Sequence, residues 1–185
     1  VGSNDAYLED FNRMSIPVSV YRVADVDITG QKFTPEDAFS EMDFDKINGD
    51  PASSAARDWQ ELAGQAKEIL TAVPAAASVT ISGTQDGTGT AKGEITGLTP
   101  GLYLVVPKES YNPDYSVLYT FTPYLTALPS SSYAVTGEGS DEWDYDTTIG
   151  LKPDADQQFG TLNITKTLEN YNEALGKATF VFHIV

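Results

Sequence analysis

Hydrophobic and polar side chains alternate over short stretches through most of the chain, which predicts a mainly β protein. The first such stretch is 16–23, where Val18, Val20 and Val23 mark the buried face of a strand. Proline lacks the N–H that a strand ladder needs, so Pro123 should interrupt the longest of the later strands. These later strands are predicted at 78–82, 91–95, 102–106, 118–128 and 143–151.

A single long stretch, 51–72, has the spacing of an amphipathic helix, and Pro74 ends it. Its apolar positions are Ala55, Ala56, Trp59, Leu62, Ala63, Ala66, Ile69, Leu70 and Val73. A shorter helix through about Met42 is predicted after Thr34 and Pro35, because these residues fit the N-cap and the first helical position.

A second unit is predicted at the end of the chain. The polar stretch 153–160 is typical of a linker, and two further strands are predicted at 162–168 and 178–185. A two-stranded hairpin is rarely stable alone. We therefore expect a first domain over 1–157, followed over 158–185 by a linker and the start of a second, truncated β domain. Packing of these last strands onto the first domain is the alternative.

Composition narrows the classes of function. The formal net charge is −16 and no cluster of Lys and Arg is visible, so we expect no nucleic-acid partner. Cysteine is absent, which excludes disulfides, thiolate metal sites and cysteine nucleophiles. No signal peptide or membrane-spanning run is visible. We therefore interpret the chain as the mature, soluble part of something larger, without membrane contact.

The usual catalytic and metal-binding patterns are weak. His183 is the only histidine, so no Ser-His-Asp triad or multi-histidine site can be built. The stretch 43–50 has oxygen ligands and a glycine turn, but its register does not fit an EF-hand, and a solvated turn with a helix cap explains it better. Asp144 and Asp146 fit an exposed strand face better than a carboxylate pair. We expect no enzyme, no cofactor and no metal.

Several motifs in order resemble the pilus and adhesin subunits of Gram-positive bacteria, which sortases assemble on the cell wall. They are Val20–Val26, Gly97–Val106, Tyr119–Pro129, Trp143–Lys152, and Leu162–Thr167 with Ala178–Phe182. The resemblance implies an extracellular protein of immunoglobulin-like (CnaB-type) β-sandwiches strung end to end, here with a helical insertion at 51–72. The last pair of motifs resembles the opening of a pilin isopeptide-linkage domain.

In this family, a lysine nine residues after a tryptophan accepts the next subunit. The resemblance therefore implies that Lys152 is the sortase acceptor and that Trp143 and Tyr145 anchor its strand. The chain departs from the family pattern, since Gly150 and Leu151 stand where Val-Tyr-Pro usually precedes the lysine. A solvated surface lysine at a strand end is the alternative interpretation of Lys152.

Domains of this family often close an internal amide between a buried lysine and an asparagine, with a nearby acid. Arg22 occupies the strand position where the first unit would need that lysine, and arginine stays protonated. The glutamate motif of the family is also distorted here. Glu109 has the family's distance to Pro113, but Tyr103 lies too far ahead of Glu109. We therefore predict no internal isopeptide bond within 1–157. In the second unit Lys166 corresponds to the family lysine and should be unreacted, with an edge-strand lysine as the alternative.

Two functions remain from the sequence. In the first, the chain is a structural subunit whose partners are neighbouring pilin subunits and the pilus sortase. In the second, it is a tip or stalk adhesin that binds host glycan or matrix protein through the helix at 51–72 and the loop at 130–142. The loop tyrosines Tyr111, Tyr115 and Tyr133 could stack on sugars, and they are also ordinary packing residues.

Overall fold

The computed structural model describes residues 5–49, 56–84, 91–128, 130–131, 143–144 and 150–158, and it is mainly β, as the alternation predicts. A six-stranded antiparallel sheet has the order β4-β3-β1-β5-β8, with β2 paired to one end of β1. A three-stranded antiparallel sheet has the order β11-β7-β6, and β9 pairs with β10. The strands of the large sheet are β1 (Ser15–Val26), β2 (Phe33–Pro35), β3 (Ala77–Gly83), β4 (Ala91–Lys92), β5 (Gly101–Pro107) and β8 (Tyr124–Leu128). The other strands are β6 (Ser110–Tyr111), β7 (Val117–Phe121), β9 (Ser130–Ser131), β10 (Trp143–Asp144) and β11 (Pro153–Gln157).

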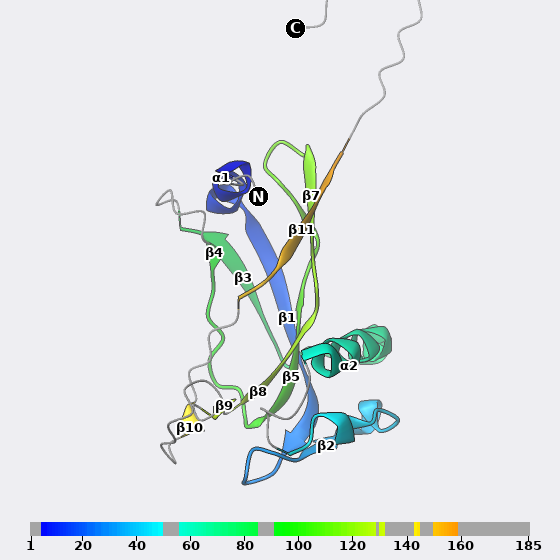
Figure 1. Ribbon diagram of the computed structural model, residues 1–185. Helices are drawn as coiled ribbons and strands as arrows, with labels where there is room; N and C mark the ends of the chain where they lie inside the picture. The colour runs from blue at the N-terminus through cyan, green and yellow to red at the C-terminus, as the bar shows by residue number, and fades with distance from the viewer. Residues whose placement is uncertain are drawn as a thin grey trace, which may run out of the picture.

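Two α-helices lie at different places along the large sheet (Figure 1). The helix α1 (Asp5–Arg13) lies at the end of the molecule where β1 begins, and α2 (Ala56–Ile69) lies against the sheet nearer the opposite end. Single 3-10 turns are η1 (Asp37–Phe39), η2 (Phe44–Lys46) and η4 (Leu70–Ala72). None of the helices in the described ranges has the length and apolarity to cross a membrane.

The long helix is confirmed over α2, and the start of its predicted range lies outside the described residues. The shorter helix is wrong, because Thr34 and Pro35 belong to β2, where Pro35 pairs with Ala24 of β1. Only the single turn η1 follows, and Glu36 stands at its N-cap position without a side-chain cap. Helix α1 was not predicted, because its nine residues are short for a helical period to be recognised, although Leu8 and Phe11 lie at helical spacing.

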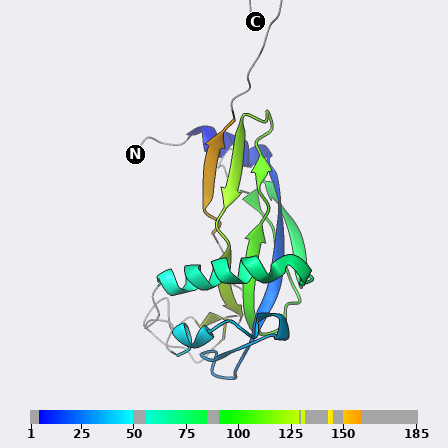
Figure 2. The same cartoon turned by 90° about the vertical axis from the view of Figure 1, so that its right-hand side faces the viewer.

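The first core lies between the large sheet and α2 (Figure 2). Leu62, Ala63 and Ala66 of α2 are buried against Leu102 and Leu104 of β5. The connecting turns after β2 add further buried side chains, which are Phe39, Met42, Phe44 and Ile47. The helical insertion therefore covers one face of the large sheet and is part of its core.

The second core lies between the large sheet and the β6–β7–β11 sheet. Ile16, Val18 and Val20 of β1 are buried there together with Tyr103 of β5 and Tyr119 of β7. Phe11 of α1 packs against this core, and its ring centroid lies 4.8 Å from that of Tyr119. The helix α1 therefore closes one end of this core.

Strand β1 contributes to both cores because it contains a β-bulge. Arg22 pairs with Tyr103 and Ala24 pairs with Leu102, so Val23 is the extra residue on β1. Val23 and Ala24 are consecutive, yet both are fully buried in the α2 core. The bulge shifts the alternation by one residue and places the side chains of Arg22 and Asp25 on the same side.

The predicted strand 118–128 is divided between the two sheets. Its first half, β7, pairs with β6 and β11, whereas its second half, β8, pairs with β5. The break lies at Thr122–Pro123, where the proline cannot donate to a ladder. Pro123 therefore marks the change of sheet.

The predicted linker at 153–160 is wrong over its first part, because 153–157 form β11. The stretch is polar because Ala155 alone of these residues packs into the second core, while Asp154 and Asp156 are exposed. Backbone pairing with β7 holds the strand, and proline is tolerated as its first residue. The predicted strand 143–151 is observed only at β10, since 150–151 are not in a strand and 145–149 lie outside the described residues. The strands predicted at 162–168 and 178–185 also lie outside them.

Close packing between α1 and β3 predicts a large effect of one glycine. A Cβ on Gly83 would lie 2.0 Å from the carbonyl oxygen of Asn12, so Gly83→Ala should lower the free energy of unfolding by about 2 kcal/mol. Gly64 within α2 has no atom within 4 Å of its Cβ position, so Gly64→Ala should raise it by about 0.5–1 kcal/mol. Urea unfolding of both variants checks this. An unchanged midpoint for Gly83→Ala would contradict the packing of α1 on β3.

The turn between β1 and β2 predicts acid sensitivity. Thr29 donates to the Asp27 carboxylate, as do the backbone N–H groups of Lys32 and Gln31, and these bonds hold the pKa of Asp27 below 3.8. Because the folded pKa is lowered, the turn's contribution to stability is complete above the unfolded pKa and is lost as pH falls through the folded pKa. Carboxyl carbon NMR should give an Asp27 midpoint below 3.8.

The matched acid-unfolding comparison uses Asp27→Asn and Asp37→Asn. The side chain of Asp37 makes no hydrogen bond with the described residues, so Asp37→Asn should leave the acid-unfolding curve unchanged. Asp27→Asn should make stability fall less steeply below about pH 4. Identical curves for the two variants would contradict this role of Asp27.

Candidate functional site

Lys152 lies at a junction between the second core and a strand. Leu151 before it packs into the second core, and Pro153 after it begins β11 opposite Phe121 of β7. Lys152 itself is exposed, and it makes no ion pair or hydrogen bond with the residues that the structure describes. Its two neighbours therefore hold the backbone while its amine stays in solvent.

The structure does not place Trp143 and Lys152 on one strand. Trp143 belongs to β10, where its backbone pairs with Ser131 of β9. Lys152 instead precedes β11, which belongs to a different sheet. Tyr145 lies outside the described residues, as does Lys166. Anchoring of the lysine by the tryptophan therefore stays a prediction, and the anchor that the structure describes is Leu151.

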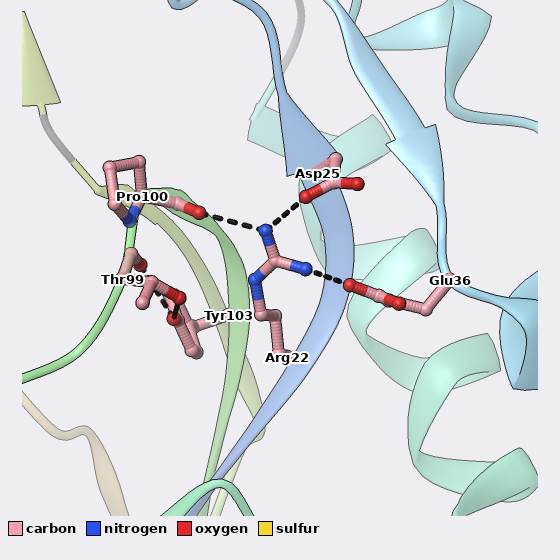
Figure 3. A network of polar contacts seen from close by, with 6 residues as sticks. All are labelled: Arg22, Asp25, Glu36, Thr99, Pro100 and Tyr103. Atoms are coloured by element: carbon pink, nitrogen blue, oxygen red, sulfur yellow. Dashed lines mark hydrogen bonds and ion pairs between the residues drawn. The ribbon is translucent and has the colours of Figure 1, made fainter.

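Arg22 is the centre of a polar cluster near the end of β1 (Figure 3). Its Nη1 donates to Glu36, and its Nη2 donates to Asp25 and, over 2.9 Å, to the carbonyl oxygen of Pro100. These partners come from β1, from the residue after β2 and from the residue before β5. The guanidinium therefore joins three segments at one end of the large sheet.

A glycine makes room for this guanidinium. A Cβ on Gly101 would lie 2.8 Å from Nε of Arg22 and 3.0 Å from the carbonyl oxygen of Ala24. Nε is buried there and has no hydrogen-bond partner among the described residues. Next to it, the hydroxyl of Tyr103 donates to the carbonyl oxygen of Thr99 over 2.6 Å, which fixes the turn that leads into β5.

The environment of Arg22 suits a permanent cation. A lysine that attacks an amide must lose its proton, and a guanidinium paired with two carboxylates retains its charge. Glu109, whose spacing partly fits the family pattern, is exposed in the connection between β5 and β6. The absence of an isopeptide bond within 1–157 stays a prediction, and the structure gives Arg22 a structural role.

Residues 43–49, the described part of the stretch 43–50, form a capped turn. Asp43 accepts a hydrogen bond from the Asp45 backbone, which caps η2. The side-chain oxygen of Asn48 accepts a hydrogen bond from the Phe33 backbone N–H, and its side-chain nitrogen donates to the Asp45 carboxylate. Nowhere in the described ranges do three or more acidic or histidine side chains gather as metal ligands.

Of the predicted loop tyrosines, Tyr111 is the last residue of β6 and Tyr115 lies in the turn that follows, with ring centroids 5.5 Å apart. Both are exposed. Tyr133 and His183 lie outside the described residues, as does Asp146. The side chain of Asp144 is outside them too, so the carboxylate pair is not tested.

A polar cluster that the sequence did not reveal lies at the base of this turn. The carboxylate of Asp10 accepts from the Tyr119 hydroxyl over 2.8 Å and from the Asn112 amide over 3.2 Å. Asn112 is buried, and its side-chain oxygen accepts from the Val117 backbone. The signal in the sequence was a lone Asn-Pro dipeptide in a polar loop, and nothing local connects it with a residue more than a hundred positions earlier.

Comparison of the chain with protein-family models, with curated proteins and with solved structures finds no match in any of the three. The resemblance to pilus subunits therefore stays a prediction that rests on the sequence motifs.

The ion pairs of Arg22 should contribute more to stability than the exposed ion pair of Lys46. Arg22→Gln removes the donors for Glu36 and Asp25 from a side chain that is 27% exposed, and it should lower the free energy of unfolding by about 1–2 kcal/mol. Lys46→Gln breaks the exposed pair with Glu61 and should cost less than about 0.5 kcal/mol. Denaturant unfolding gives both values. Equal effects would refute a special role of Arg22.

Proposed function

We propose that this protein is a structural subunit of a sortase-assembled pilus or wall-anchored adhesin on the surface of a Gram-positive bacterium. In this proposal it acts as a substrate, and its fold is an immunoglobulin-like (CnaB-type) β-sandwich followed by a second domain of the isopeptide-linkage type. The observation that carries the proposal is Lys152, an exposed amine without a partner in the described part of the chain, next to a core-anchored Leu151.

The proposed reaction is aminolysis. A sortase holds the C-terminal residue of a neighbouring subunit's sorting signal as a thioester. The neutral amine of Lys152 attacks the thioester carbonyl, an amide N–C bond forms and the C–S bond breaks. The amine loses a proton as the sulfur leaves, and the enzyme's thiol is regenerated. The packing of Leu151 beside the lysine supports this step, because an anchored backbone loses less freedom when the amine enters the active site.

Other features support a structural role. The described sheets are antiparallel, they enclose two cores, and the chain lacks cysteine. Its net charge of −16 favours solubility and discourages nonspecific association.

An adhesin that binds host glycan or matrix protein without polymerisation is the second candidate. The exposed Tyr111 and Tyr115 favour it, because exposed aromatic rings often contact ligands. The apolar face of α2 gives it no support, since Leu62, Ala63 and Ala66 are used in the first core. The polar face of α2 remains available to a ligand under this alternative, whereas most of the stretch 130–142 lies outside the described residues.

Substitution of Lys152 tests the main proposal. The full chain is incubated with a pilus sortase and a sorting-signal peptide, and branched lysines are mapped by mass spectrometry. We expect a branch at Lys152 and its loss in Lys152→Arg, because arginine keeps the charge and cannot attack. The control Lys108→Arg changes another exposed lysine and should leave the branch intact. Absence of any branch, with a sortase that is active on its own pilin, would reject the subunit role.

A further inference from the structure

The outward face of the β6–β7–β11 sheet has an unusual composition. Tyr111, Leu118 and Asp156 lie side by side across the three strands, because Tyr111 and Asp156 both pair with Leu118. The alternate positions on the same strands, Tyr119 and Ala155, pack into the second core. Tyr111, Leu118 and Asp156 therefore face away from that core.

The next row on this face adds a second carboxylate, since Asp154 pairs with Thr120 of β7. Both Asp154 and Asp156 are exposed, and neither forms an ion pair with a described residue. Lys108 precedes β6 and Lys152 precedes β11, so no basic residue lies within the three strands. The β11 edge of this face is therefore acidic, and no basic residue lies on the two strands beside it.

Two aromatic rings lie at one end of this face. Tyr111 is 47% exposed and Tyr115 is 72% exposed, and their ring planes are tilted by 36°. Tyr115 has a φ of 61°, a left-handed conformation that is uncommon for a residue with a large side chain. The turn thus keeps two rings in water although neither is needed in a described core.

The turn that carries these rings is held rigidly. Asp114 accepts two hydrogen bonds from Ser116, one from its hydroxyl over 2.6 Å and one from its backbone N–H over 3.0 Å. These bonds, with the hydroxyl as the larger cause, lower the pKa of Asp114. Asn112 beneath the turn pairs twice with Val117 and is also bound to Asp10 of α1. A rigid surface loses little entropy when a partner binds.

We propose that this face is a docking surface for a polypeptide segment that carries arginine or lysine side chains. Tyr111 and Tyr115 supply ring faces for cation–π contacts, Leu118 packs against the aliphatic stem, and Asp114, Asp154 and Asp156 oppose the charge. We call these six residues the acidic-aromatic face.

Charge complementarity selects this partner over others. Cations are attracted to a chain with a net charge of −16 and to an ionised carboxylate beside tyrosine rings. Nucleic acid and anionic lipid are repelled for the same reason. A second copy of this acidic face is also repelled. The inference does not depend on the proposed function, since Lys152 is not part of the acidic-aromatic face.

Binding of fluorescent oligoarginine and oligolysine to the full chain tests the proposal, with a neutral Gly-Ser peptide for comparison. Binding should weaken with added salt. Tyr111→Leu with Tyr115→Leu should reduce affinity by about two- to fivefold per ring, and the corresponding Phe substitutions should restore it, because phenylalanine keeps the ring face. Lys152→Ala should not weaken binding, because it removes a positive charge close to Asp154.

Two matched double variants distinguish binding at this face from attraction of the peptide to the negative charge of the whole chain. Asp154→Asn with Asp156→Asn removes two negative charges from the face, and Asp37→Asn with Glu41→Gln removes two exposed charges elsewhere. Only the first pair should weaken peptide binding, by about two- to fivefold. Equal weakening by both pairs would overturn the proposal, as would peptide binding unaffected by the leucine variants. Tyrosine-dependent binding of oligosaccharide without peptide binding would also overturn it. Circular dichroism confirms that each variant folds.

Discussion

Strand β1 must pack against two different cores, and the bulge at Val23 lets it do so. Before the bulge, Ile16, Val18 and Val20 contribute to the core that β7 and β11 close. After it, Val23 and Ala24 contribute to the core that α2 closes. A regular strand would place Ala24 on the opposite side, beside Arg22, and the α2 core would lose contacts at the centre of the sheet. The helical insertion and the second sheet thus depend on one extra residue.

The same bulge creates the Arg22 cluster. It brings Asp25 to the side of Arg22 and leaves the guanidinium over Gly101, where no side chain competes for the space. Glu36 arrives from the other side because β2 pairs with β1 just beyond the bulge. An arginine at this point holds together the segments that enter and leave the sheet, and it does so without a covalent bond.

Local periodicity predicted the strands that bury one face and the helix α2, because Val18 and Val20, or Leu62 and Ala66, repeat at the spacing of their element. It failed where tertiary contacts decide. Strand β11 has a single packed side chain, Ala155, and owes its conformation to pairing with β7. The sequence likewise showed a proline break at Pro123, but not that the two halves of the strand enter different sheets. For the candidate site, the sequence identified Lys152 and showed only that Arg22 cannot form an isopeptide bond. The anchoring Leu151 and the Arg22 partners Glu36 and Pro100 required the fold.

The position of Lys152 has a mechanical consequence under the proposed acceptor role. Tension would enter the chain at the Lys152 side chain and continue along the backbone toward the C-terminal side, through β11. Residues before Lys152 would lie outside this path, and the two cores would not be pulled apart by it. Under this role, the cores of the domain would not need a covalent cross-link to resist the load. Strand β11 would instead bear the load along its own backbone, and because a strand is already extended, its five pairings with β7 would not have to break.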